Sequence, residues 1–311
     1  MAFRMFMSSG DLIADRRYDF ARDLQLRGDL AGAADLMAQA AELAPGFASA
    51  WFALGEMQEE LNQNNAAIDA YRKALAADAE DRHGASVRLM RLGASELSEM
   101  PKGYVRSLFD QYAPKFDAAL IGDLHYRGPE VLRKAVVAAR QIQKKPLHFA
   151  RAIDLGCGTG LAAKALASVV ETFIGIDISS GMIAQAKATG LYARLDVCDM
   201  IEGLAREAGA SADLVISADA FVYLKDLEPV LRASARALKP QALVGFTVET
   251  HAGAGTVMGE GFRYAHSEAV VRDALRDAGF VDARIENVST RNDGGLPVPG
   301  LVVTGVRAPS S

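Results

Sequence analysis

Short apolar runs alternate with amphipathic stretches along the second half of the chain. Five largely apolar runs of six to eight residues lie at 150–155, 172–177, 192–197, 212–218 and 242–249. The stretches between them, such as 227–238, carry apolar residues at helical spacing. Apolar strands separated by helices predict a parallel β-sheet covered on both faces. Candidate ligand-binding residues are those just beyond the strand ends, because ligands of such sheets lie at the carboxyl edge.

The first third of the chain has a helical period and repeats itself. Residues 34 positions apart match in kind at Ala33, Met37 and Ala40 against Ala67, Tyr71 and Ala74. The stretch 51–80 also resembles the tetratricopeptide repeat, through Trp51, Leu54 and Gly55.

This resemblance and the 34-residue spacing predict an all-α module over residues 1–100. We expect repeats at about 14–47 and 48–81 and a cap at 82–94. Pro101 and Gly103 indicate a boundary, and a second domain is predicted over 104–308. The repeats offer either a surface for a protein partner or a scaffold that dimerises or covers the other domain.

Composition excludes several classes of function. Half of the 311 residues are hydrophobic and 23% are charged, which is typical of a packed globular protein. Residues 1–100 carry 10 Lys and Arg against 16 Asp and Glu, a net −6, and the remainder carries 24 against 23, a net +1. Neither part has the basic excess typical of nucleic-acid binding. The sequence shows no signal-peptide core, no run of about 18 apolar residues, and no metal or disulfide spacing for its two cysteines. We therefore expect a cytoplasmic protein with no metal, nucleic-acid or membrane partner.

The first apolar run leads into "DLGCGTG", with Asp154 at the strand end and glycines at 156, 158 and 160. Glycine serves where the backbone needs positive φ or where a ligand must come close. A dinucleotide fingerprint G-x-G-x-x-G would place its third glycine at Leu161, one residue later than Gly160. Three further acids, Asp177, Asp199 and Asp219, follow the next three runs in order.

This glycine turn resembles motif I of class I S-adenosylmethionine (SAM)-dependent methyltransferases. The resemblance implies an α/β, Rossmann-like sheet of seven strands with a terminal antiparallel hairpin at 281–289 and 300–307. It also implies SAM as cofactor. Asp177 would accept hydrogen bonds from the ribose, Asp199 would meet the adenine amino group, and Asp219 would lie at the methionine end. The other implied cofactor-binding residues are Asp154, Gly156, Cys157, Gly158, Gly160, Ile178, Met182 and Met200. Cys157 is interpreted as a small loop residue rather than a nucleophile.

Residues on the methyl-acceptor side are less specific. His266 is the leading candidate base, beside a helix start predicted at Ser267, and it is otherwise a buried histidine that orders its loop. Tyr264 and Tyr223 complete the predicted catalytic set. Arg127 or Arg263 would suit a carboxylate. Further candidates are Tyr112, Phe116, His125, Tyr126, Glu249 and His251.

The predicted function is transfer of a methyl group from SAM to an unidentified small-molecule or protein acceptor by in-line displacement. One alternative is a binding protein whose repeats carry the function and whose cofactor domain is a vestige. A second is an NAD-linked oxidoreductase, because an acid about twenty residues after a glycine turn also occurs in that class.

Overall fold

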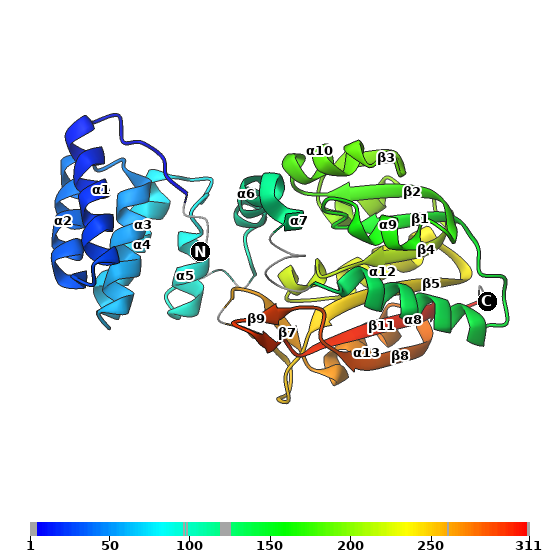
Figure 1. Ribbon diagram of the computed structural model, residues 1–311. Coiled ribbons are helices and arrows are strands. Elements are labelled where there is room, and N and C mark those ends of the chain that lie inside the picture. The colour runs from blue at the N-terminus through cyan, green and yellow to red at the C-terminus, as the bar shows by residue number, and fades with distance from the viewer. Residues whose placement is uncertain (1–4, 96, 98, 119–125, 260, 310–311) are drawn as a thin grey trace. The chain divides into compact units, whose positions relative to one another are not determined.

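The computed structural model describes residues 5–95, 97, 99–118, 126–259 and 261–309. The chain forms two compact units, one up to Gln111 and one from Tyr112 (Figure 1). The sequence-based boundaries of 1–100 and 104–308 assigned the helix α6 (Lys102–Tyr112) to the second domain, whereas the compact units divide at its end. None of the described helices is long and apolar enough to cross a membrane.

The first unit is helical. Its first five helices are α1 (Leu12–Leu26), α2 (Leu30–Leu43), α3 (Ala48–Glu60), α4 (Asn64–Ala77) and α5 (Ala85–Arg91). Each predicted repeat therefore contains two helices, and the predicted cap contains one. Close approach depends on small residues: a Cβ at Gly55 would lie 2.5 Å from the ring of Tyr71, so any larger residue on α3 would push α4 away.

The second unit is built on a mostly parallel sheet. Its seven long strands are β1 (Phe149–Leu155), β2 (Val170–Asp177), β3 (Tyr192–Val197), β4 (Ala212–Ser217), β5 (Leu238–Glu249), β8 (Phe280–Val288) and β11 (Gly300–Arg307). They lie in the order β3-β2-β1-β4-β5-β11-β8. The first five are parallel, and β11 is antiparallel to both β5 and β8. The predicted seven-stranded sheet and its antiparallel hairpin are confirmed.

Short strands extend this sheet beyond the prediction. Strand β6 (Thr256–Met258) pairs with β7 (Tyr264–His266), and β7 pairs with the end of β5. A separate hairpin joins β9 (Asn292–Asp293) to β10 (Leu296–Pro297). Strand β5 also begins at Leu238, where the apolar pattern predicted the last residue of a helix.

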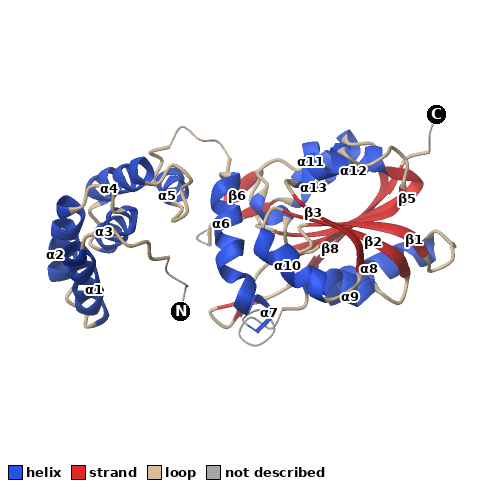
Figure 2. Ribbon diagram, turned by 90° about the horizontal axis from the view of Figure 1, so that it is seen from above, coloured by secondary structure: helices blue, strands red, loops and turns tan. Residues whose placement is uncertain are grey.

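Helices cover both faces of the sheet (Figure 2). Helices α8 (Gly128–Ile142) and α9 (Leu161–Leu166) pack on one face through Leu132, Val136 and Leu166. Helices α11 (Met200–Ala205), α12 (Glu228–Ala237) and α13 (Glu268–Asp277) pack on the other. Helix α10 (Ser180–Ala188) lies against β2 and β3. The central strands β1, β2, β4 and β5 are thus largely buried on both sides, and the carboxyl edge of the sheet is left for ligands.

Candidate functional site

The glycine turn connects β1 to α9 at the carboxyl edge of the sheet. Gly156, Gly158 and Gly160 have φ of 63°, 54° and 94°, the left-handed conformation that glycine adopts without strain. A Cβ at Gly156 would lie 2.3 Å from the Cβ of Ala220 and 3.2 Å from Cε of Met200. The turn therefore requires glycine at this position both for its conformation and for its neighbours.

Asp177 at the end of β2 holds the turn in place. Its carboxylate accepts hydrogen bonds of 2.8 Å from the backbone N–H groups of Gly158 and Ser179, and only 6% of the residue is exposed. Ile178 next to it is half-buried. Met182 is fully buried in α10, and its N–H is capped by the Ser179 hydroxyl.

Asp154 at the end of β1 is fully buried. Its Oδ2 accepts a hydrogen bond of 2.7 Å from the Tyr192 hydroxyl, while Oδ1 has no partner among the described residues. Burial raises the pKa of Asp154 to about 7, against the lowering effect of the Tyr192 hydrogen bond and with a further rise from Asp177. An unsatisfied carboxylate oxygen beside the glycine turn is a place for a ligand donor.

The acid after β3 has a structural role as well. The Asp199 carboxylate caps α11 by accepting hydrogen bonds from the N–H groups of Ile201 and Glu202, while Met200 reaches toward Gly156.

Cys157 is buried in the turn. Burial, and then the neighbouring Asp154 and Asp177, raise the pKa of its thiol well above the usual value. A thiol that stays protonated fits the interpretation of Cys157 as a small loop residue.

Asp219 follows β4 in the left-handed conformation, with φ of 53°, which is uncommon for a residue with a side chain. Its N–H donates to the Thr247 hydroxyl, which in turn donates to its Oδ1. Burial raises the pKa of Asp219, although hydrogen bonds from Thr247 and Thr290 and the charges of Arg263 and Arg291 oppose the rise.

Tyr126 lies close to these carboxylates. Burial, and then the charges of Asp219 and Asp154, raise the pKa of its hydroxyl well above the usual value, so the phenol stays protonated. It can therefore donate a hydrogen bond to a carboxylate. A residue that lies just before α8 is thus close to the carboxylates that follow β1 and β4.

A polar network continues from the end of β5. Arg263 donates to the Tyr223 hydroxyl at 3.2 Å, and its guanidinium lies 3.7 Å from the carboxylate of Glu249. Arg291 contacts the same Glu249 oxygen at 2.6 Å. The interaction of Arg263 with Tyr223 raises the pKa of the Arg263 guanidinium, so Arg263 keeps its charge. Arg127, the other candidate for a carboxylate, is exposed and faces Glu130.

His266 lies on β7 and is fully buried. Its Nε2 lies 3.0 Å from the Leu224 carbonyl, so Nε2–H is the donor, and Nδ1 has no partner among the described residues. Burial lowers the pKa of His266, which keeps the ring neutral. Tyr264 is also buried and lies on the same strand, β7.

The other two candidate histidines do not join this cluster. The His251 ring contacts the backbone of its own loop, at the Gly253 N–H and the Gly255 carbonyl, and His125 lies outside the described residues.

Residues 153–246 match the family model described as a methyltransferase domain. This range includes the three glycines of the turn and the four aspartates Asp154, Asp177, Asp199 and Asp219. Human methyltransferase-like protein 27 is 41% identical over 93 residues, which are 30% of this chain and 36% of that protein. The ubiquinone biosynthesis O-methyltransferase of Paracidovorax citrulli is 33% identical over 106 residues, 33% of this chain and 44% of that one. The match thus covers less than half the length of either relative.

Solved structures share the arrangement of the sheet unit. The [4+2]-cyclase SpnF has a TM-score of 0.53 at 18% identity, over 67% of this chain and 96% of that one. Magnesium protoporphyrin IX methyltransferase from Synechocystis PCC 6803 has a TM-score of 0.50 at 20% identity, over 67% and 99%. The sheet unit has the methyltransferase fold.

A segment that precedes α8 contacts the glycine turn of this methyltransferase fold. Short helices η1 (Ala113–Lys115) and α7 (Phe116–Ala118) precede α8. The Thr159 hydroxyl donates to the carboxylate of Asp117 at 2.6 Å, and the Phe116 ring lies 3.9 Å from where a Cβ of Gly158 would be. The segment therefore covers the outer side of the turn.

Some residues of this methyltransferase fold escaped the sequence reasoning. Asp117 and Thr159 meet across 42 residues, and Arg291 meets Glu249 across a similar interval. No periodic pattern marks such pairs, because the two members of each pair lie 42 residues apart in the sequence. Within the described residues, no group of three or more His, Cys, Asp or Glu is arranged to hold a metal ion.

Proposed function

We propose that this protein is a SAM-dependent methyltransferase. The observation that carries the proposal is the turn Gly156–Gly160, which sits at the carboxyl edge between two buried carboxylates, Asp154 and Asp177. The match of residues 153–246 to a methyltransferase domain supports it. The fold alone does not, because the [4+2]-cyclase SpnF shares that fold.

The residues present suit the cofactor. The bare backbone at Gly156 and Gly158 leaves room for the methionine half, and the free Oδ1 of buried Asp154 can accept a donor from it. Asp177, buried beside the glycine turn, would accept hydrogen bonds from the ribose hydroxyls. Ile178 and Met182 would flank the adenine. Asp199 and Met200 would meet its amino group and its ring.

The reaction would be an in-line displacement. When bound, SAM supplies an electrophilic methyl group whose bond to sulfur breaks as the bond to the acceptor atom forms. The protein holds the acceptor in line, and orientation of this kind is worth roughly 7–11 kcal/mol. The segment with Phe116 and Asp117 would help to exclude water from the turn.

The proton of the acceptor has two candidate bases. His266 was predicted from the sequence, but its ring is fully buried and its Nε2 is bound to the Leu224 carbonyl. Asp219 lies next to Ala220, which is close to the glycine turn, and burial raises its pKa, which makes its carboxylate a stronger base. We therefore propose Asp219 as the base and His266 as the residue that orders the segment around β7. Tyr126, Tyr223 and Tyr264 would line the acceptor side, and Arg263 rather than exposed Arg127 would bind an acceptor carboxylate.

We also propose that the helical unit is a tetratricopeptide module that binds a protein partner. Two helices in each 34-residue unit support this assignment, as does the close packing of Gly55 on Tyr71. The sequence features that suggest repeats are independent of the methyl-transfer site, so either proposal can fail alone.

Calorimetric titration with SAM tests the cofactor. We expect binding by the intact chain and a loss of about 10–100-fold in Asp177→Ala, because a charged hydrogen bond contributes about 1.5–3 kcal/mol. Glu286→Ala, on exposed edge strand β8, is the matched control and keeps full affinity. Binding of NADH in place of SAM would overturn the proposal.

Label transfer tests the reaction. Extract from cells that lack the gene is incubated with the chain and methyl-labelled SAM, and the acid-soluble and protein fractions are counted. Incorporation that Asp177→Ala abolishes is expected. Cofactor binding without incorporation in either fraction would instead favour a vestigial cofactor domain.

A further inference from the structure

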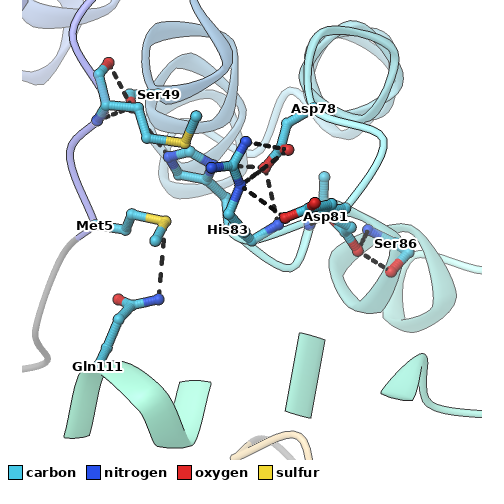
Figure 3. A network of polar contacts seen from close by, with 11 residues as sticks. Met5, Ser49, Asp78, Asp81, His83, Ser86 and Gln111 are labelled. Carbon is cyan, nitrogen blue, oxygen red and sulfur yellow. Dashed lines mark hydrogen bonds and ion pairs between the residues drawn. The ribbon is translucent and has the colours of Figure 1, made fainter. Parts of the chain in front are cut away.

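The N-terminal segment Met5–Ser9, here called the strap, lies against the helical unit without regular secondary structure. A single side chain binds both backbone groups of its Met7. The Met7 N–H donates to the Ser49 hydroxyl oxygen at 2.8 Å, and the same hydroxyl lies 3.2 Å from the Met7 carbonyl (Figure 3). Ser49 thus contacts the strap as a receptor contacts a peptide backbone.

The receptor side is buried and well supported. Ser49 is 1% exposed, and its hydroxyl lies 3.0 Å from Nε2 of His83. Nδ1 of His83 lies 3.9 Å from the carboxylate of Asp78, which Arg82 also holds. Ser49, His83 and Asp78 are arranged in the order of a catalytic triad. Here, however, the Ser49 hydroxyl is hydrogen-bonded to the Met7 backbone, so we interpret the three residues as a binding arrangement and not as a nucleophile with its base. A buried hydroxyl is costly unless it is hydrogen-bonded, so Ser49 needs a partner of this kind.

The strap's side chains are held less firmly than the residues beneath them. The Phe6 ring lies 5.1 Å from that of Tyr18 and 6.0 Å from that of Phe47, and both of these rings are buried. Phe6 itself remains 48% exposed. Below it, the strap is tied to α1 through Ser8 and Ser9, which donate to the Asp15 carboxylate.

We propose that Tyr18, Phe47, Ser49 and His83 form a binding site, the strap site, for a linear peptide of a partner protein. The peptide carries an aromatic residue followed by an apolar one, as Phe6 and Met7 do in the strap. The strap fills the site in cis and is displaced by the partner. This inference rests on the proposed protein-binding role of the helical unit and is independent of methyl transfer.

Displacement is feasible because, at the strap site, the strap is held by one aromatic side chain and the backbone of one residue, whereas the site itself is built from buried side chains. The contacts of Met5 with Gln111 and of Ser8 and Ser9 with Asp15 lie outside this site. A tethered segment competes at an effective concentration in the millimolar range. A partner peptide that makes more contacts with the site can bind tightly enough to outcompete the strap at that effective concentration.

The test uses the full chain and a fluorescein-labelled peptide with the sequence Met-Phe-Met-Ser-Ser-Gly, which is residues 5–10. Phe6→Ala weakens the strap and should raise the affinity for the added peptide by about tenfold over the unmodified chain, as measured by fluorescence anisotropy. Phe20→Ala, which removes an exposed phenylalanine of α1, is the matched control and should leave the affinity unchanged. The combined change Phe6→Ala with Ser49→Val should abolish binding, and so should alanine at the phenylalanine of the peptide.

Circular dichroism confirms that each variant is folded. Equal binding by the unmodified chain and Phe6→Ala, or no binding by either, overturns the proposal. A Phe6→Ala or unmodified chain that elutes as a dimer with exchanged straps would also overturn it, because the occupant would then be a second copy. Hydrogen exchange at the Met7 amide provides a second measurement: if it is as slow as in the core of α3, the strap is a fixed part of the fold.

Discussion

The carboxylate of Asp177 accepts the backbone N–H of Gly158 at 2.8 Å, so the end of β2 holds the turn that follows β1. The residues lie 19 positions apart in the sequence and on neighbouring parallel strands. The same carboxylate also binds the N–H of Ser179, which caps the start of α10. One buried acid therefore fixes both the glycine turn and the start of α10, which would surround a cofactor.

Asp177 should contribute to stability even without a ligand. In Asp177→Ala the N–H groups of Gly158 and Ser179 lose their acceptor in a buried setting, which costs about 1–3 kcal/mol each. Asp177→Asn keeps one acceptor oxygen and should be less damaging. Chemical denaturation followed by circular dichroism measures both, and equal stability of the two variants would contradict this account.

Gly156 should tolerate no side chain. Gly156→Ala adds a Cβ at 2.3 Å from that of Ala220, and the positive φ adds strain of roughly 1–2 kcal/mol. Gly190→Ala is the matched control, because Gly190 has a similar φ of 69° and open space around its Cβ position. We expect Gly190→Ala to show only the strain and Gly156→Ala to lose about 1–3 kcal/mol more from the overlap, together with SAM binding. Thermal unfolding and calorimetry distinguish the two.

Most of the fold follows from apolar patterning. The run at 212–218 became β4 almost unchanged, because a buried strand needs a continuous apolar run, and the less apolar run at 192–197 became the edge strand β3. The start of β5 was misplaced since Leu238 suits a helix end and a strand equally well. The short strands β6 and β7 have three residues each, too few for any period to be visible.

The positions of the site residues were predictable from the sequence where those residues lie at the ends of strands. Asp154, Asp177 and Asp219 follow apolar runs, and the carboxyl ends of parallel strands share one edge. The burial of His266 was not predictable. Ser267 correctly marks the helix start, but the contact of His266 with Leu224 spans 42 residues and leaves no local pattern.

Cofactor binding should depend on pH through Asp154. Burial raises the pKa of this carboxyl to about 7, so it is protonated below pH 7 and charged above. A cationic ligand favours the charged form, so the affinity for SAM should increase as the pH rises to about 7 and then level off. Below that pH the loss should approach about tenfold per pH unit.

Calorimetry from pH 5.5 to 8.5 checks this, with Asp154→Asn as the comparison. The difference between the two chains removes the contribution of titrating groups on the ligand. The asparagine variant should show no step near pH 7. A step of the same size in both chains would assign the effect to the ligand.

Asp219→Asn should separate the reaction from binding. If Asp219 is the base, the asparagine variant retains SAM affinity, while label transfer falls by about 10²–10⁴-fold for an acceptor that must lose a proton. His266→Gln preserves a donor toward Leu224 and should keep most of its activity at some cost in stability. The opposite result, loss of transfer in His266→Gln with retention in Asp219→Asn, would return the role of base to His266.

His83 should make the helical unit sensitive to mild acid. Burial lowers the pKa of His83, against the raising effect of Asp78, so the folded unit keeps this ring neutral where the unfolded chain already takes up a proton. The resulting stability is complete above the unfolded pKa of about 6.5 and is lost as the pH falls below it. Trp51, the single tryptophan, is buried in this unit and reports its unfolding by fluorescence. Between pH 7 and 5 the denaturation midpoint should fall more steeply for the unmodified chain than for His83→Gln, and parallel curves would show that the buried ring does not govern the transition.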